Sequence, residues 1–325
     1  MKIAVTGASG HVGANLCRKL IAEGHQVKAL VHKNRNAIQG LDLEIVSGSL
    51  QDKESLRTLF KDCEAAFHLA AIISISGKKQ ELIDTNVLGT NNLLDVIREN
   101  GVRRLVHFSS IHALSHFPLD KPMDETRPLV EESPMYYEIT KSRGEGLVRR
   151  AVEQGLDAVI INPTAIVGPF DFKPSLVGQV LIKMYKGTLP ALVPGGYNWV
   201  DVRDIVQGAI SALEHGRKGE RYILSGHWMD VKDLALLVEK VTHKKVTKFK
   251  VPMFLAKAGV PFIKAYAKAT SQEPLYTYDS LRTLKEVNKA ISHDKAGNEL
   301  GYRPRNLEQT IKDTVDWYKS NGFLD

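Results

Sequence analysis

The chain has 325 residues, of which 43% are hydrophobic and 25% charged, the balance of an ordinary globular enzyme. This length allows one or two domains with substantial cores. The net charge of +7 favours acidic ligands such as phosphates, or mild attraction to anionic membranes. A solvated surface with some excess lysine is the alternative that we favour. The basic residues form no basic arm, zinc-ligand spacing or arginine-rich run, so we do not expect nucleic-acid binding.

The chain contains only two cysteines, Cys17 and Cys63. We predict neither a disulfide framework nor a metal site, and a reducing compartment suits this composition. Residues 1–5 predict a short strand rather than the apolar region of a signal peptide. No apolar run reaches the ~18 residues of a membrane span. We therefore expect a cytoplasmic protein.

The first half of the chain alternates short apolar runs with segments of helical periodicity. Gly24 supplies the stop signal of the first helix, and Ser133 is placed to cap the last one, with Pro134 in its first turn. We predict strands over residues 2–6, 26–31, 43–46, 65–71, 104–109 and 158–162. We predict helices from residue 11 and over residues 53–61, 79–100 and 134–153.

This alternation favours an α/β fold, a Rossmann doubly wound parallel sheet with helices on both faces. The ligand crevice of such a sheet lies at the carboxyl ends of its strands. After about residue 165 the alternation fails. We predict a dinucleotide-binding Rossmann domain over residues 1–165. Residues 166–325 then form a smaller, mainly substrate-binding α/β domain, with some segments returning to the Rossmann sheet.

Three glycines, Gly7, Gly10 and Gly13, lie between the first strand and the first helix. The first allows a sharp turn, the second lets a pyrophosphate approach the backbone, and the third lets helix and strand pack closely. The start of the helix adds unpaired amide hydrogens and the positive end of a dipole. We predict a dinucleotide site here rather than a purely structural turn. Its further contacts are Ser9, His11 and Val12.

The end of the second strand predicts which dinucleotide binds. An acidic residue there would favour NAD, but the sequence continues with His32, Lys33, Asn34 and Arg35. His32, Lys33 and Arg35 would attract a 2′-phosphate, so we expect NADP(H), with NAD(H) still open. A solvated basic loop is the alternative. Asp52 is placed either near the adenine or as the cap of the next helix, and it could do both.

Tyr137 and Lys141 lie one helical turn apart on the same face. A tyrosine is a poor acid or base at neutral pH, and a neighbouring ammonium lowers its pKa by stabilising the phenolate. Such a tyrosine can protonate a carbonyl that is being reduced, or deprotonate an alcohol. A hydroxyl must also hold the substrate oxygen. Ser110, at the end of the fifth strand, is our candidate, with Ser109 as the alternative.

Together these features resemble the extended short-chain dehydrogenase/reductase family, within the NAD-dependent epimerase/dehydratase superfamily. The likeness is strongest to its dihydroflavonol 4-reductase and 3β-hydroxysteroid dehydrogenase branch, and it covers nearly the whole chain. The matching segments are TGASGHVG at residues 6–13, HLAA at 68–71, NVLGT at 86–90, FSS at 108–110, YEITK at 137–141, NPTAIVGP at 162–169, WVDVRD at 199–204 and LGYRP at 300–304.

The resemblance implies hydride transfer between a nicotinamide and a small carbonyl or alcohol substrate. In that reaction Tyr137 would be the acid/base, Lys141 would hold the nicotinamide ribose, and Ser110 would orient the carbonyl. Asn86 would be structural. Besides Tyr137 and Lys141, the resemblance implies cofactor contacts at Leu69, Ala70, Ala71, Pro163, Ala165 and Ile166.

Three functions are consistent with the sequence. The first is an NADPH-dependent carbonyl or aldehyde reductase. The second is a nucleotide-sugar epimerase or dehydratase that keeps a tightly bound NAD and returns the hydride. The third is a dinucleotide-binding protein without catalysis, which the intact Tyr137 and Lys141 disfavour. A homodimer also stays open.

Two features have more than one interpretation. His112 follows the serine pair and could touch substrate or pack against the loop before Tyr137. Residues 251–269 interleave apolar residues with lysines. This segment could be an amphipathic helix covering the core, a lid over an apolar substrate, or a surface helix touching a membrane. Membrane contact is not our leading expectation.

Overall fold

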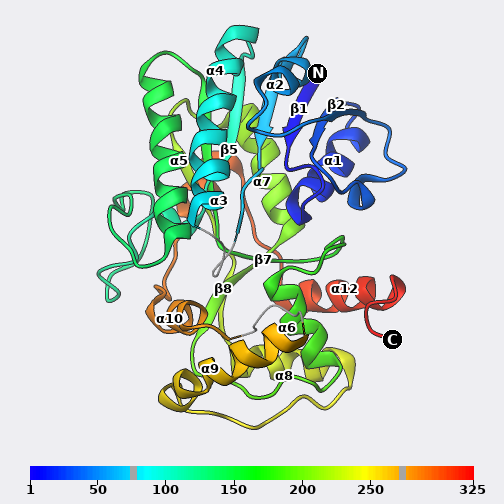
Figure 1. Ribbon diagram of the computed structural model, residues 1–325, viewed down its shortest axis with the longest axis vertical. Coiled ribbons are helices and arrows are strands. Elements are labelled where there is room, and N and C mark those ends of the chain that lie inside the picture. The colour runs from blue at the N-terminus through cyan, green and yellow to red at the C-terminus, as the bar shows by residue number, and fades with distance from the viewer. Residues whose placement is uncertain (74–78, 271–275) are drawn as a thin grey trace.

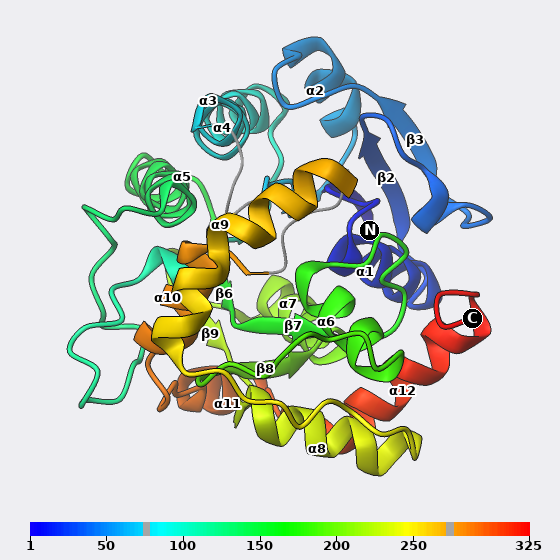
Figure 2. The same cartoon turned by 60° about the horizontal axis from the view of Figure 1, so that its bottom comes forward.

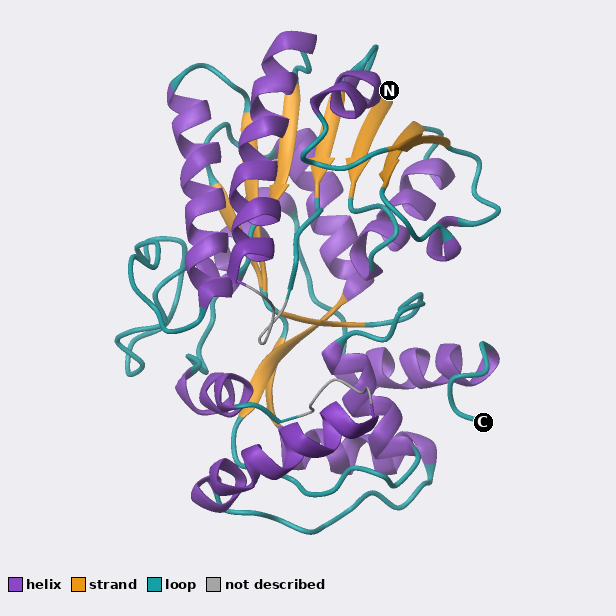
Figure 3. Cartoon of the chain, in the orientation of Figure 1, coloured by secondary structure: helices purple, strands orange, loops and turns teal. Residues whose placement is uncertain are grey.

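The computed structural model describes residues 1–73, 79–270 and 276–325, except for the side chains of residues 264 and 266–270. Seven parallel strands form the central sheet in the order β3-β2-β1-β4-β5-β6-β9 (Figures 1 and 3). These strands are β1 (Lys2–Thr6), β2 (Gln26–Val31), β3 (Glu44–Ser47), β4 (Ala65–His68), β5 (Arg104–Phe108), β6 (Ala158–Pro163) and β9 (Arg221–Leu224).

Helices cover both faces of this sheet. Alternate residues of β1 point to opposite faces, as strand geometry requires: Ile3 and Val5 belong to one buried cluster and Ala4 to the other. The first cluster is covered by α1 (His11–Ala22), α7 (Val202–His215) and α11 (Asp294–Leu300). The second is covered by α2 (Lys53–Phe60), α4 (Thr90–Asn100) and α5 (Tyr136–Glu153). The predicted Rossmann architecture is therefore confirmed.

A smaller lobe is built around a second sheet, in which β8 (Gly196–Asp201) lies between β7 (Ala165–Val167) and β10 (His227–Asp230). It lies below the central sheet in Figure 1 and has its own apolar core. Its helices are α6 (Leu176–Tyr185), α8 (Val231–Thr242), α9 (Met253–Thr270), α10 (Tyr278–Glu286) and α12 (Leu307–Ser320). β9 returns to the central sheet, as the sequence predicts. The domain boundary at residue 165 stays a prediction.

Several predicted boundaries need correction. The fourth strand ends at His68 rather than at residue 71, so Leu69–Ala71 form a loop at the carboxyl edge of the sheet. The helix expected over residues 79–100 is divided into α3 (Lys79–Ile83), a π-helical stretch η2 (Asp84–Gly89) and α4. The side chain of Asn86 in that stretch bonds the backbone N–H and C=O of Ile72 and the Thr140 hydroxyl. These bonds to other segments fit a structural role for Asn86.

The predicted cap of α5 is wrong. The helix begins at Tyr136, with Met135 at the cap position. The Ser133 hydroxyl accepts a hydrogen bond from the Met135 N–H and donates one to Glu138. Ser133 therefore organises the turn that leads into the helix rather than its first residue, and Pro134 precedes the helix.

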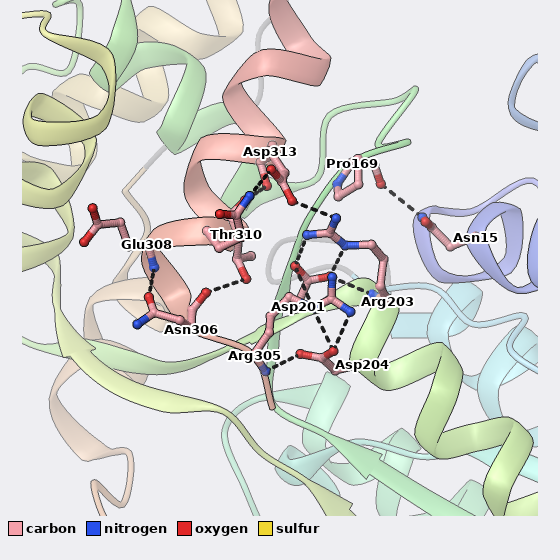
Figure 4. Close-up of polar contacts among 12 residues, drawn as sticks. Asn15, Pro169, Asp201, Arg203, Asp204, Arg305, Asn306, Glu308, Thr310 and Asp313 are labelled. Carbon is pink, nitrogen blue, oxygen red and sulfur yellow. Dashed lines mark hydrogen bonds and ion pairs between the residues drawn. The ribbon is translucent and has the colours of Figure 1, made fainter. Parts of the chain in front are cut away.

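Charged side chains join the C-terminal segment to both lobes (Figure 4). Arg305 donates to Asp204 of α7 from both its backbone N–H and its guanidinium, each at 2.8 Å. Arg203 pairs with Asp201 and with Asp313 of α12. The carboxylates of Asp201 and Asp204 are buried, so these bonds compensate desolvated charges.

We predict that Arg305→Ala lowers the free energy of unfolding by about 2 kcal/mol or more, because it removes the guanidinium that pairs with buried Asp204. Urea-induced unfolding measures the change. Lys312→Ala is the matched control, since it removes an exposed pair with Asp316 and should cost less than about 0.5 kcal/mol. Equal losses in the two variants would contradict this account.

No helix among the described residues is long and apolar enough to cross a bilayer.

Candidate active site

The glycine turn is tightly constrained by its neighbours. Gly7 has a φ of +73°, and a Cβ there would lie 2.7 Å from the backbone nitrogen of Ala70. A Cβ on Gly13 would lie 2.1 Å from the carbonyl oxygen of Gly7. Glycine is therefore required at both positions by close backbone approach. The result is a bare backbone loop at the carboxyl end of β1.

This loop has the features that a pyrophosphate needs. Gly10 precedes α1 and is exposed, and no side chain caps the helix there. The first amide hydrogens of a helix lack intrahelical acceptors and attract anions. Ser9, His11 and Val12 are half-buried around the turn. The His11 ring bonds the carbonyl oxygen of Pro169 at 3.1 Å, which leaves its backbone as the part available to a phosphate.

The basic residues after β2 are all exposed at the same sheet edge. His32, Lys33 and Arg35 follow Val31, and Arg35 donates to the Ser47 hydroxyl at the end of β3. No carboxylate follows directly on β2. Asp52 accepts a hydrogen bond from the Glu54 N–H and so caps α2, which confirms one of its two predicted roles.

Ser110, Tyr137 and Lys141 come together at the carboxyl end of β5. The Ser110 hydroxyl acts on the Tyr137 hydroxyl and favours its ionised form, and it also accepts a hydrogen bond from the His112 N–H at 3.2 Å. Lys141 donates from Nζ to the carbonyl oxygen of Phe108 at 2.7 Å. The alternative serine, Ser109, is buried, and its hydroxyl has no partner among the described residues. The structure thus brings the predicted three together and favours Ser110 over Ser109.

The ionisation of this group differs from the sequence expectation. Burial raises the pKa of Tyr137 above its ordinary value, and the influence of the Ser110 hydroxyl opposes this only in part. Burial also lowers the pKa of Lys141 to about 8, against the attraction of Glu145. The pKa of Tyr137 is therefore raised and not lowered as expected, because its phenolate is desolvated and lies near the Glu138 carboxylate. Tyr137 is a protonated hydroxyl at neutral pH.

The remaining predicted cofactor contacts lie at the ends of β4 and β6. Leu69, Ala70 and Ala71 are half-buried in the loop beside Gly7. Ala70 donates its N–H to the Thr6 hydroxyl, which also bonds His68. Pro163 ends β6, and Ala165 and Ile166 begin the half-buried strand β7. The predicted cofactor residues other than His32, Lys33, Arg35 and Asp52 thus lie near the ends of β1, β4 and β6, or, for Tyr137 and Lys141, at the end of β5.

The sequence did not reveal a chain of polar contacts beside Tyr137. His112 lies edge-to-face with the Tyr137 ring at 6.0 Å, and its Nδ1 lies 3.3 Å from Glu138 Oε1. Burial alone would raise the pKa of Glu138, but bonds from His112 and Ser133 hold it below its ordinary value. In the sequence, these contacts of Glu138 were indicated only by its place five residues after Ser133 and directly after Tyr137.

A cavity of about 430 Å³ adjoins these residues. His112, Glu138 and Met135 line one side of it, and Arg282 and Thr283 of α10 line another. Both interpretations of His112 therefore have support: it packs beside Tyr137 and the segment before it, and it also faces a space that a ligand can enter. The cavity lies between the segment around His112 and Glu138 and the helix α10 of the smaller lobe.

The model of the NAD dependent epimerase/dehydratase family matches residues 3–225 of this chain. The match includes the glycine turn, Ser110, Tyr137 and Lys141. The chain belongs to the NAD-dependent epimerase/dehydratase family. Members of this family include NAD(P)-dependent oxidoreductases, epimerases and dehydratases that act on small molecules.

Relatives within the epimerase/dehydratase family cover the full length of the chain. Sterol demethylase protein B of Methylococcus capsulatus is 34% identical over 100% of both chains. A putative dihydroflavonol 4-reductase of Synechocystis is 32% identical, over 98% of this chain and 95% of the relative. The crystal structure of gox2253 has 33% identity and a TM-score of 0.86, covering 100% of this chain and 99% of the other.

Epimerase structures are more distant. The UDP-glucuronic acid 4-epimerase of Bacillus cereus, with a TM-score of 0.80, is 20% identical over 99% of this chain and 100% of the other. At that identity the likeness shows the shared fold alone.

The two glycines of the turn provide a matched pair of substitutions. We predict that Gly13→Ala lowers the free energy of unfolding by about 1–3 kcal/mol, because its Cβ would meet the Gly7 carbonyl oxygen at 2.1 Å. Gly10→Ala should cost less than about 1 kcal/mol, since its Cβ would lie 3.3 Å from the same atom. Denaturant unfolding of both variants tests this, and a larger loss in Gly10→Ala would contradict the packing described.

Proposed function

We propose that this member of the epimerase/dehydratase family is an NADP(H)-dependent oxidoreductase that reduces a ketone or aldehyde on a largely apolar small molecule. The observation that carries the proposal is the meeting of the Ser110 and Tyr137 side chains at the carboxyl end of β5, one helical turn from Lys141 and at the same edge of the sheet as the glycine turn. A non-catalytic dinucleotide binder has no use for such a buried acid.

The chemistry follows from the charge that develops on the substrate. A bound nicotinamide supplies the hydride, and the carbonyl oxygen becomes negative as its carbon is reduced. Tyr137, protonated at neutral pH, donates a proton to that oxygen. Ser110 donates a hydrogen bond to the same oxygen and fixes its position. The Lys141 ammonium stabilises the phenolate that Tyr137 becomes, and holds the nicotinamide ribose.

The geometry of α5 supports these proposed roles. Lys141 is tied to the end of β5 through the Phe108 carbonyl, two residues before Ser110. Asn162 of β6 donates to the Ser110 carbonyl oxygen at 3.0 Å and to Glu145 of α5 at 2.9 Å. These bonds hold the Ser110 segment and α5 at a fixed separation. A preorganised donor pair costs little reorganisation during reaction.

Relatives with reductase names support reduction over epimerisation. One is the putative dihydroflavonol 4-reductase. Another is a ketoreductase of Stigmatella aurantiaca, named for a farnesyl-bearing dihydroquinoline oxide, which is 29% identical over 97% of this chain. The exposed His32, Lys33 and Arg35 support a preference for NADP(H) over NAD(H), because they offer positive charge to a 2′-phosphate.

We predict that Tyr137→Phe reduces kcat for NADPH-dependent carbonyl reduction by at least about 100-fold, because it removes the proton donor. The Kd for NADPH, measured by fluorescence titration, should change less than about threefold. Tyr136→Phe is the matched control: Tyr136 is 45% exposed, with its ring against Lys79, and its loss should leave turnover intact. Substantial turnover in Tyr137→Phe would refute the assignment.

Cofactor choice is tested at Arg35. We expect Arg35→Ala to raise the Kd for NADPH roughly 10- to 100-fold, the cost of a lost hydrogen bond to a charged group, and to leave the Kd for NADH nearly unchanged. Arg103→Ala is the control, because Arg103 is an exposed arginine before β5, at the opposite end of the strands. If Arg35→Ala raised the Kd for NADPH and the Kd for NADH by the same factor, Arg35 would not bind the 2′-phosphate.

A further inference from the structure

The helix α9 is apolar on two opposite faces. Val260 is fully buried in the core of the smaller lobe, and Met253 and Ala256 pack against that core. This confirms that the helix covers the core. The other face is exposed and equally apolar: Phe254 is 70% and Phe262 78% exposed. A soluble surface helix normally presents polar residues on its outer face.

The exposed apolar residues follow helical spacing along one side of α9. Positions 254, 255, 258, 261, 262 and 265 are all exposed, and they recur at intervals of three and four residues. They form a continuous stripe about three turns long. Phe249, 66% exposed in the segment before the helix, adds a further aromatic side chain. Figure 2 shows α9 across the front of the smaller lobe.

The charge of the whole protein is concentrated in the same segment. Residues 243–270 contain seven lysines and no acidic residue. The remainder of the chain has 37 basic and 37 acidic residues, so it is neutral. The net charge of +7 therefore belongs to the segment that also carries the exposed aromatic residues.

Most of the described lysines in this segment are exposed and form no ion pair with another described residue. Lys248 lies 3.8 Å from Glu239 of α8, and Lys244 lies over the Tyr185 ring. Lys245, Lys250 and Lys257 are exposed and make no ion pair within the described part of the chain. Exposed cations flanking an apolar stripe are the composition of helices that lie in a membrane interface.

We propose that residues 244–263, the α9 surface, dock the protein on an anionic lipid bilayer. The aromatic residues enter the boundary between headgroups and acyl chains, and the lysines contact anionic headgroups. The helix lies in the plane of the interface, since no described helix can span a bilayer. Its buried face keeps its contacts with the core, so docking needs no refolding. The inference does not depend on the proposed reaction.

The α9 surface belongs to the lobe that contributes to the cavity beside Tyr137. α9 packs against α10, whose Arg282 and Thr283 line that cavity. Docking would therefore bring the substrate side of the protein close to the bilayer. That arrangement suits an apolar substrate dissolved in lipid, a consequence that does rest on the proposed function.

Vesicle flotation of the full chain tests the docking. Vesicles of phosphatidylcholine alone are compared with vesicles that contain about one third phosphatidylglycerol, at low and at high salt. We expect flotation with the anionic vesicles at low salt and a loss of at least about tenfold with the neutral vesicles or at high salt.

Two sets of variants separate the contributions. Phe254→Ser combined with Phe262→Ser, and Lys245→Gln combined with Lys250→Gln and Lys257→Gln, should each reduce flotation by about tenfold or more. Neutralising the exposed Lys121, Lys173 and Lys319 is the matched control and should change flotation less than about twofold. Circular dichroism establishes that each variant is folded.

The proposal fails if the folded protein does not float with anionic vesicles at low salt, or if the control variant loses as much binding as the lysine variant. It also fails if the protein is a dimer in solution that Phe254→Ser and Phe262→Ser dissociate without any vesicle binding. That last result would assign the apolar stripe to a second copy of the chain.

Discussion

The bond from the Lys141 ammonium to the Phe108 carbonyl oxygen, at 2.7 Å, ties α5 to the end of β5. Both groups are buried, so water does not compete for this bond. The bond sets the height of α5 against the sheet and thereby places Tyr137 against Ser110. The same burial lowers the pKa of Lys141 to about 8 and raises that of Tyr137. One packing arrangement thus fixes both the geometry and the protonation of the site.

Much of this arrangement could be predicted from the sequence because it depends on local patterns. Glycine spacing, the period of apolar residues and the four-residue separation of Tyr137 and Lys141 are local, and each led to the correct element. Contacts between distant segments could not be predicted. The π-helical stretch around Asn86 depends on Ile72 and Thr140, and the Tyr137 pKa depends on burial by several elements. The prediction that Ser133 caps α5 was wrong because its hydroxyl bonds the Glu138 side chain, and the helix begins only at Tyr136.

The two lobes carry different features of the reductase that we propose. The neutral Rossmann part presents bare backbone at the glycine turn and an isolated basic cluster after β2. The smaller lobe carries the net positive charge of the chain and the exposed stripe of α9. Between the two lobes, the bonds of Arg305 with Asp204 and of Arg203 with Asp313 join α7 to the C-terminal segment (Figure 4). The proposed cofactor binding, substrate contact and surface docking therefore fall on separate parts of the molecule.

The central claim is that the enzyme reduces its substrate with net consumption of cofactor, rather than returning the hydride as an epimerase does. The most direct test is to incubate the protein with NADPH deuterated at nicotinamide C4 and a panel of apolar ketones, and to analyse the alcohols by mass spectrometry. The account predicts one deuterium in each alcohol and one NADP⁺ formed for each alcohol. Conversion of a sugar nucleotide without any NADP⁺ formation, and no reduction of the ketones, would contradict it.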